Sequence, residues 1–164
     1  MRSPIAEELM PDHWKRLRDL RLASLRESPD AFGGNLEAEE MQDEGQWRAK
    51  FEQLTHLVAV IDGEDVAVLS VENLDGDFGA TCWLGGCWVN PKFRGVGVMR
   101  SLIAYIDSHA AERGWDVQGL GVFSDNDDAI TSYERLGFVR MGELQPSKRR
   151  PDRMFQRMIR NRTS

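Results

Sequence analysis

Hydrophobic residues recur along this chain at two spacings, which separate predicted helices from predicted strands. Residues 11–27 place their apolar side chains on one helical face, and the same spacing returns at Trp47, Phe51 and Leu54. Arginines fill the other positions of the first segment and predict a solvent-exposed face there: Arg16, Arg18, Arg21 and Arg26. We therefore expect two helical segments near the N-terminus, joined by a loop at residues 28–34.

Short aliphatic runs predict strands through the middle and the end of the chain. A tight turn at residues 62–65 separates two of these runs and predicts a hairpin. The predicted strands cover residues 57–61, 66–72, 81–89, 117–123, 138–142 and 154–159. The last of them is expected to close the sheet.

The strand predicted at residues 81–89 contains two adjacent glycines, Gly85 and Gly86. Such a pair indicates a bulge or a close backbone approach, and the simpler alternative is a bend. Cys82 and Cys87 lie five positions apart on the same strand. In a regular strand they point to opposite faces, so no disulfide is expected between them.

A glycine turn follows this strand and leads into the longest predicted helix. The apolar run stops at Asn90, the turn carries Gly95 and Gly97, and helical spacing then continues to Gly114. A glycine directly after the last helical residue is a common helix end. The order of elements is therefore strand, glycine turn and helix.

This order has a chemical consequence, because the first turn of a helix carries unpaired backbone N–H groups and a partial positive charge. Glycines let a ligand approach that backbone closely, and the turn also carries Lys92, Arg94 and Arg100. These features predict a phosphate or diphosphate site, although a turn that only reverses the chain is the alternative. A dinucleotide motif is disfavoured because Arg100 occupies its third glycine position. No P-loop motif is present, so coenzyme A is the favoured ligand.

Two sequence segments together identify a family resemblance. They are residues 92–97, and the run from Asn126 through Ala129 and Tyr133 to Phe138. They resemble the GNAT superfamily of acetyl-CoA-dependent N-acetyltransferases, although Lys92 stands where glutamine or arginine is usual. The resemblance implies a mixed α/β fold with a mostly antiparallel central sheet and helices on both faces. It also implies a splay between two parallel central strands, and one domain over residues 1–164.

The resemblance assigns roles to particular residues of this sequence. Tyr133 is expected to protonate the departing thiolate, since the pKa of a phenol, about 10, differs only modestly from that of a thiol, about 8.5. The alternative is an ordinary core tyrosine bonded to a backbone carbonyl. Asn126 either caps a helix, contacts the pantetheine arm, or does both. The residues expected to bind acetyl-CoA are Cys87, Trp88, Val89, Arg94, Gly95, Val96, Gly97, Val98, Met99, Arg100, Asn126 and Tyr133.

The general base is less well defined by the sequence. Family members often use a glutamate on the strand before the turn, but residues 81–89 contain no acid and no histidine. Glu72 on the neighbouring strand is the candidate, and its alternative is an exposed structural residue. Water relayed to backbone carbonyls is equally open, and Cys87 as an acyl-carrying nucleophile ranks below both.

Composition and charge limit the partners. The net charge of −6 argues against nucleic acid and favours cationic partners. Acids in the second helical region predict either a mouth for a cationic amine or simply a solvated face: Glu37, Glu39, Glu40, Asp43 and Glu44. The basic loop at residues 148–153 is expected to be a hairpin tip rather than a contact to the 3′-phosphate of coenzyme A.

The remaining expectations concern location and function class. No apolar run reaches membrane-spanning length and no signal-peptide core is present, so we expect a cytoplasmic protein without membrane contact. No metal-type spacing of cysteine and histidine occurs, so no metal is expected. The exposed strand at the C-terminal end could pair in a homodimer. The function expected is acetyl transfer to a small or peptide amine, and the alternative is a non-catalytic acyl-CoA-binding module.

Overall fold

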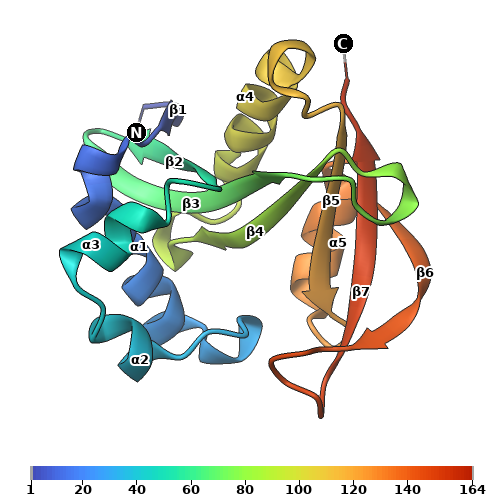
Figure 1. Cartoon of the computed structure of the whole chain (residues 1–164). Helices are drawn as coiled ribbons and strands as arrows, with labels where there is room; N and C mark the ends of the chain where they lie inside the picture. Colours follow the sequence, from blue (N-terminus) through green and yellow to red (C-terminus); the bar gives the residue numbers. More distant parts are fainter. Residues whose placement is uncertain (1, 164) are drawn as a thin grey trace.

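One seven-stranded sheet forms the centre of the structure, a computed structural model that describes residues 2–163 (Figure 1). Its strands lie in the order β1-β2-β3-β4-β5-β7-β6. Every neighbouring pair is antiparallel except β4 and β5, which are parallel. The strands are β1 (Ile5–Glu8), β2 (Thr55–Ile61), β3 (Glu64–Asn73), β4 (Cys82–Val89), β5 (Val117–Phe123), β6 (Val139–Pro146) and β7 (Met154–Asn161).

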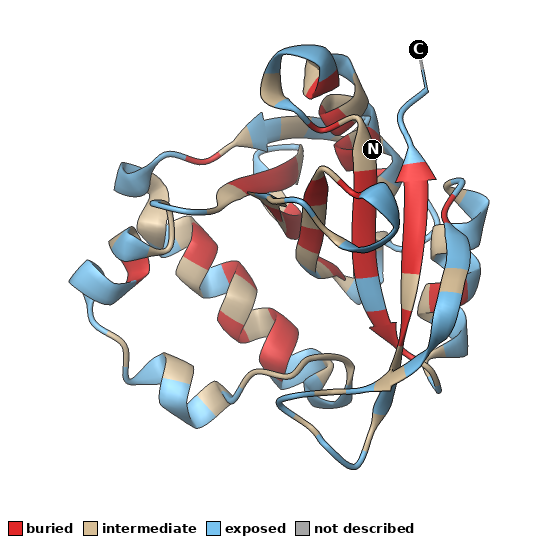
Figure 2. Ribbon diagram, turned by 45° about the vertical axis from the view of Figure 1, so that its right-hand side comes forward, coloured by how far each residue is buried: buried red, intermediate tan, exposed pale blue. Residues whose placement is uncertain are grey.

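Within residues 2–163, five α-helices cover the two faces of this sheet, as predicted. They are α1 (Trp14–Glu27), α2 (Leu36–Glu40), α3 (Glu44–Ala49), α4 (Val98–Arg113) and α5 (Asp127–Arg135). On one face, α1 and α3 bury Leu17, Leu20 and Trp47 against the sheet. On the other, α4 and α5 bury a larger cluster that includes Leu102 and Ile130. Figure 2 shows the buried residues concentrated along the central strands and the inner side of α1.

The parallel pair at the centre of the sheet separates after a short contact. β4 and β5 pair only at Cys82 with Gln118, Trp83 with Gly119 and Leu84 with Leu120. Beyond these three pairs the strands diverge, which confirms the predicted splay. The divergence starts where β4 reaches its two glycines.

A β-bulge at these glycines changes the direction of every later side chain in β4. Gly85 faces Ser70 of β3 and Trp88 faces Val68, so β4 carries one more residue than β3 in this interval. Gly86 within the bulge has a φ of 57°, a left-handed conformation that favours glycine. The predicted bulge is therefore confirmed.

The bulge also overturns the expectation for the two cysteines. Because one residue is inserted between them, Cys82 and Cys87 both contact the cluster on the α4 and α5 face. Trp88, the next residue, packs on the opposite face against α1. Both cysteines are free thiols, as expected, although the assumption of a regular strand was wrong.

Two expectations about the N-terminal helices also need correction. The second helical segment is two short helices, and α3 ends at Ala49, so Phe51 and Leu54 lie beyond it. Asp43 begins α3 by accepting a hydrogen bond from the Gln46 amide at 2.8 Å. Arg21 does not belong to a fully solvated face, because it is half-buried and pairs with an acid of α2.

The helix after the glycine turn agrees with its prediction at both ends. Gly97 precedes its first residue and Gly114 follows its last, both with left-handed backbone angles. Asn126 caps α5, because its side-chain oxygen accepts a hydrogen bond from the Ala129 amide at 3.3 Å. Within residues 2–163, no helix has the length and apolar character needed to cross a bilayer.

A buried ion pair joins α4 to β7 on the face of the sheet that α4 covers. The Arg160 guanidinium donates to both Asp107 carboxylate oxygens at 2.7 Å, and these side chains are only 8% and 11% exposed. Gln118 of β5 also bonds to both partners. Burial alone raises the pKa of Asp107, but hydrogen bonds from Arg160, Gln118 and Thr163 outweigh it and hold that pKa below its ordinary value.

We expect Asp107→Asn to lower the free energy of unfolding by about 3–5 kcal/mol, because it leaves Arg160 buried without its counter-charge. Since the folded pKa of Asp107 is lowered, its contribution is present above the unfolded pKa of about 4 and is lost as pH falls through the folded value. Urea titrations at several pH values measure both effects. The control is Asp116→Asn at the exposed Arg162 pair, with a loss below about 1 kcal/mol. Equal losses in the two variants would contradict the assignment.

Candidate active site

A cavity of about 620 Å³ lies between the glycine turn, the end of β4 and α5, and we call it the turn cavity. The structure brings nearly all the residues predicted to bind acetyl-CoA together around it. Those that line it are Cys87, Trp88, Val89, Arg94, Gly95, Gly97, Val98, Met99, Arg100, Asn126 and Tyr133. Only Val96 lies outside this lining, on the exposed side of the turn.

The glycine turn presents backbone donors to this cavity. Gly95 and Gly97 have φ values of 80° and 84°, and the space beside each Cα is open. The first hydrogen bond of α4 runs from the Ser101 amide to the Gly97 carbonyl at 3.1 Å. The amides of residues 98–100 therefore have no partner within the helix, as is usual for a helix start. This arrangement fits the diphosphate of coenzyme A.

Arg94 is held by protein groups, although the sequence suggested a free cation in the turn. Its guanidinium donates to Glu27 at 2.6 Å and to the Val89 carbonyl at 3.0 Å. Glu27 also accepts from Ser28 and from the Trp88 indole. Hydrogen bonds from Ser28, Trp88 and Arg94 lower the pKa of Glu27 against the opposing effect of burial. Arg94 therefore fixes the turn to the end of α1.

Cys87 and Tyr133 form a neighbouring pair inside the turn cavity. Burial raises the pKa of the Cys87 thiol to about 11, and a hydrogen bond with Tyr133 partly opposes this shift. Burial and the adjacent Cys87 raise the pKa of the Tyr133 phenol well above its ordinary value. The Tyr133 ring packs edge-on against Phe138, with centroids 5.8 Å apart. At neutral pH both groups are therefore protonated.

The backbone of β4 contributes a further donor at the splay. The Asn90 amide donates to the Val66 carbonyl at 2.8 Å, so it faces β3. Because successive amides of a strand point in opposite directions, the Val89 amide faces the opening toward β5. An unpaired N–H at this position is suited to an oxygen that becomes negative during acyl transfer.

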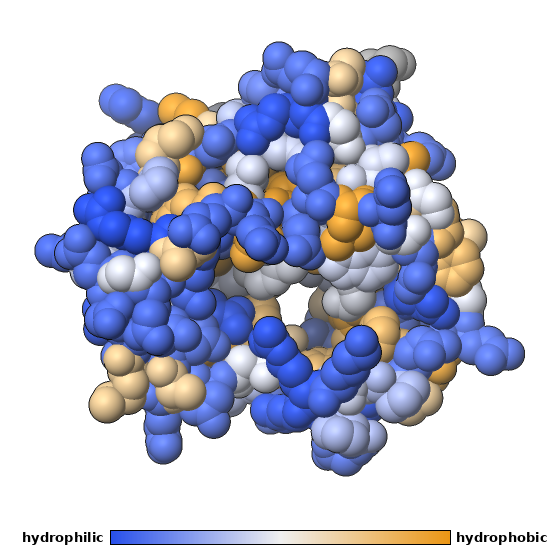
Figure 3. All heavy atoms as spheres, viewed as in Figure 1, coloured by the Kyte–Doolittle hydropathy of each residue, from blue (hydrophilic) through white to orange (hydrophobic). Residues whose placement is uncertain are grey.

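A second cavity of about 630 Å³ lies between α1, α2, α3 and the sheet, and we call it the helix cavity. Gly85 and Gly86 line it, whereas the next three residues of β4 line the turn cavity. Phe32 borders both. Figure 3 shows the molecule hollowed through near its centre, where β4 and β5 diverge in the same view in Figure 1. The two cavities therefore approach each other at the β4 bulge.

Comparison with known proteins agrees with this geometry. Residues 14–138 match the family model described as the acetyltransferase (GNAT) family, which covers most of the chain. This protein belongs to the acetyltransferase (GNAT) family. The match begins at α1 and ends after α5, so it includes the glycine turn and both walls of the splay.

Solved structures share the GNAT fold across the whole chain. Spermidine N-acetyltransferase from Vibrio cholerae, solved with CoA and spermine, has 14% identity and a TM-score of 0.73, covering 98% of this chain and 96% of its own. A Salmonella typhimurium protein with its cofactor acetyl-CoA has 17% identity and a TM-score of 0.74, covering 99% of this chain and 96% of its own. Ribosomal-protein-S5-alanine acetyltransferase from Vibrio fischeri has 13% identity and a TM-score of 0.76, covering 100% of this chain and 96% of its own. At these identities the likeness shows the fold alone.

The sequence did not predict most of the residues that line the helix cavity. His56, Ser70 and Gly85 form one row across β2, β3 and β4, and all three line that cavity. Burial lowers the pKa of His56, so this ring is neutral at pH 7. Lys50 and Arg149 line the same cavity from distant parts of the chain. No local motif connects these residues, because only strand pairing and the β6–β7 loop bring them together.

Two expectations at the site differ from the structure or receive no support from it, and a third holds with an addition. Glu72 is half-buried on β3 but lines neither cavity. The basic loop at residues 148–153 is the tip of the β6–β7 hairpin, as expected, and four of its six residues are exposed. Arg153 and Arg150 also bond to the carbonyls of Asp30 and Pro29, which the sequence did not predict. The acids around α2 do not form a free anionic mouth, because most of them pair with arginines: Glu39 with Arg21, Glu40 with Arg26 and Glu44 with Arg48.

The Cys87 thiol should alkylate slowly at neutral pH, because only the thiolate reacts and its pKa is about 11. In a Cys82→Ala background, we expect the iodoacetamide rate to rise about tenfold per pH unit from pH 7 to 10 without a plateau. Adding Tyr133→Phe should lower the rate at each pH, since the hydrogen bond that lowers the thiol pKa is removed. Mass spectrometry follows the adduct. A plateau near pH 8.5 would show an unperturbed thiol and contradict the burial argument.

Proposed function

We propose that this protein transfers the acetyl group of acetyl-CoA to a primary amine, and that the amine attacks the thioester directly while both substrates are bound. The observation that carries this proposal is the position of the two cavities on either side of the β4 bulge. One contains unpaired backbone donors and a protonated phenol, and the other offers space for an acceptor. Acetyl-CoA supplies the activated acyl group.

The glycine turn is proposed to bind the diphosphate. The amides of residues 98–100 point out of the start of α4, and the open space beside Gly95 and Gly97 allows close approach. Arg100 lines the same cavity and adds a positive charge. Arg94 instead stabilises the shape of the turn through Glu27. Asn126 keeps α5 in place by capping it and borders the path of the pantetheine arm.

Tyr133 is proposed as the general acid. As the amine nitrogen bonds to the acetyl carbon, the carbon–sulfur bond breaks and the electron pair goes to sulfur. Tyr133 gives its proton to that sulfur, and the Val89 amide stabilises the charge on the acetyl oxygen. The raised pKa of Tyr133 keeps the phenol protonated throughout the neutral range. It also makes the phenol a weaker acid, so its proton moves only as negative charge develops on the sulfur. Cys87 is unsuited to carry the acyl group because its thiol is also protonated there.

The proton of the amine is proposed to leave through water. An alkyl amine has a pKa of about 10.4 and must be neutral before it attacks. Glu72 stays a candidate base only from the sequence, since its position outside both cavities offers no support. Because the amine must lose its proton before it attacks, activity should rise with pH through the alkaline range. A cytoplasmic location and a homodimer also stay predictions of the sequence.

Tyr133→Phe should lower kcat by about 10²–10⁴-fold, because the leaving thiolate loses its proton donor, while the Kd for acetyl-CoA changes little. Thiol release with a panel of amines measures turnover, and calorimetry measures acetyl-CoA binding. Tyr105→Phe is the control, since Tyr105 stacks on His109 outside both cavities. Undiminished kcat in Tyr133→Phe would remove this residue from the mechanism. Binding of acetyl-CoA without any thiol release would favour the non-catalytic module instead.

Gly97→Ala should raise the Kd for CoA on the order of tenfold, because a methyl group occupies the approach to the backbone donors. Gly63→Ala is a matched control: its φ of 79° is close to the 84° of Gly97, and neither Cβ position has a neighbour within 4 Å. Both variants should lose about 1–2 kcal/mol of stability through the same backbone strain. Calorimetry and thermal unfolding separate the two effects. Equal CoA affinity in both variants would exclude the turn as the diphosphate site.

A further inference from the structure

The helix cavity contains more positive than negative side chains, although the whole chain is acidic. Arg21, Lys50 and Arg149 line it, and Glu39 is the one carboxylate in its lining. His56 adds no charge at neutral pH because burial lowers its pKa. Two positive charges are thus left without a counter-charge in the lining, within a protein of net charge −6.

Arg21 and Glu39 neutralise each other inside this cavity. The guanidinium donates to the two carboxylate oxygens at 2.8 and 3.1 Å, the two-point geometry that suits this pair. A Cβ at Gly34 would collide with both side chains, so the glycine leaves room for them. Neither group is therefore free to bind an acceptor.

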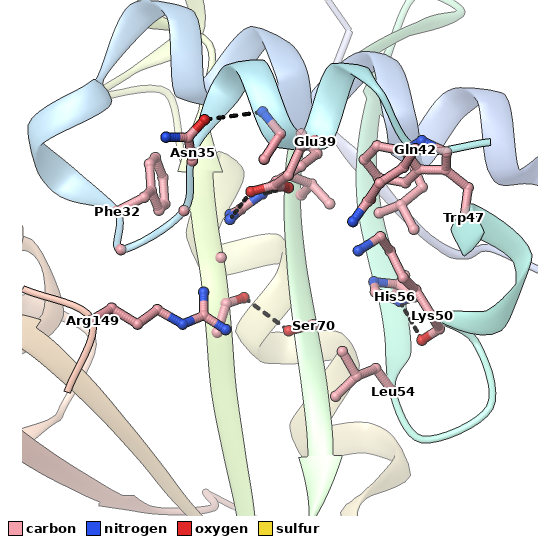
Figure 4. A pocket seen from close by; sticks show the side chains of 18 residues that line it. Phe32, Asn35, Glu39, Gln42, Trp47, Lys50, Leu54, His56, Ser70 and Arg149 are labelled. Atoms are coloured by element: carbon pink, nitrogen blue, oxygen red, sulfur yellow. Dashed lines mark hydrogen bonds and ion pairs between the residues drawn. The ribbon is translucent and has the colours of Figure 1, made fainter. Parts of the chain in front are cut away.

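Lys50 and Arg149 are the two cations left over. Within residues 2–163, neither takes part in an ion pair with a carboxylate. Figure 4 shows Lys50 and Arg149 entering the cavity from opposite sides, one after α3 and the other on the β6–β7 loop. The Lys50 ammonium lies 4.9 Å from the Trp47 ring centroid. Burial lowers the pKa of Lys50, and Arg21 and Arg149 lower it further, while Glu39 opposes them.

The other acids near the cavity do not change this balance. Glu40 pairs with Arg26 at 2.9 Å and Glu44 pairs with Arg48 at 2.9 Å. Asp43 caps α3. These carboxylates face their partners outside the cavity lining, so they offer little to a polyamine within it. A wholly cationic acceptor would meet two unneutralised like charges.

We infer that the acceptor is a small amine that also carries an oxyanion, either a carboxylate or a phosphate, which Lys50 and Arg149 bind. The inference rests on the proposed function, because it names the acceptor class of the same site. Guanidinium and ammonium groups both recognise such oxyanions. The amine then faces Gly85 and Gly86, where the wall of the cavity has no side chain and the turn cavity is close. Leu17, Leu54 and Val68 also line the cavity and suit a short carbon chain.

The test compares acceptors that differ only in the oxyanion. Each natural amino acid is paired with the amine left after its decarboxylation, and phosphoethanolamine is paired with ethanolamine; spermidine and a lysine peptide complete the panel. Thiol release from acetyl-CoA gives kcat/KM for each. The best acceptor should carry an oxyanion and exceed its partner by about ten- to a hundredfold, as expected for charged hydrogen bonds. The two kinds of pair distinguish carboxylate from phosphate.

Substitutions locate the effect in the cavity. Lys50→Met and Arg149→Gln should each raise KM for the oxyanion-bearing acceptor by about tenfold or more and leave the KM for acetyl-CoA unchanged. Lys148→Gln is the matched control, because it removes the same charge from the same loop but lies outside the cavity lining. An equal effect of Lys148→Gln would show only long-range attraction and would overturn the inference.

The outcomes separate this inference from the proposed function. If the best acceptor is spermidine or another amine without an oxyanion, acetyl transfer stands and the acceptor class is wrong. If no acceptor is turned over, calorimetry of the same pairs against the CoA-loaded protein decides. If the oxyanion-bearing member of a pair binds more tightly, and this advantage is lost in Lys50→Met, the inference is supported although the proposed acetyl transfer is not. Equal binding, or none, overturns the inference.

Discussion

The structure depends on the early separation of two parallel strands. β4 and β5 share only three residue pairs, and the bulge at Gly85 and Gly86 turns β4 away from its neighbour. Separation of paired strands leaves backbone N–H and C=O groups without partners, which is costly unless a ligand or water satisfies them. At this protein's splay the unpaired groups border a cavity, so a structural cost becomes a set of hydrogen-bond donors and acceptors at the centre of the molecule.

The bulge also decides which side chains meet at the centre. One inserted residue moves Cys87 to the face covered by α4 and α5, where it contacts Tyr133, and sends Trp88 to the other face, where it bonds to Glu27. Glu27 in turn holds Arg94 and therefore the glycine turn. A single backbone irregularity thus connects the chemistry of the thioester region with the rigidity of the proposed diphosphate site.

The local charge of the helix cavity differs from the net charge of the chain. The acids of α2 and α3 are largely paired with arginines, and only Glu39, itself paired with Arg21, lines the helix cavity. Lys50 and Arg149 come from segments about a hundred residues apart and are brought to one cavity by the β6–β7 loop. Net charge describes long-range attraction, whereas the local balance of paired and unpaired groups decides which acceptor a cavity can hold.

The sequence by itself determined the elements whose signals are local. The glycine turn, the helix that ends at Gly114 and the Asn126 cap follow from backbone angles and side-chain hydrogen bonds that involve only nearby residues. The residues that β4, the glycine turn and Asn126 and Tyr133 bring to the turn cavity followed as well, because the family resemblance covers them. Those from the loop after α1, such as Phe32, did not. Only the tertiary structure decided on which face of the sheet Cys87 lies, that Glu72 lines neither cavity, and which residues line the helix cavity. Strand register, ion-pair partners and loop packing bring together residues far apart in the chain, and no short pattern records such contacts.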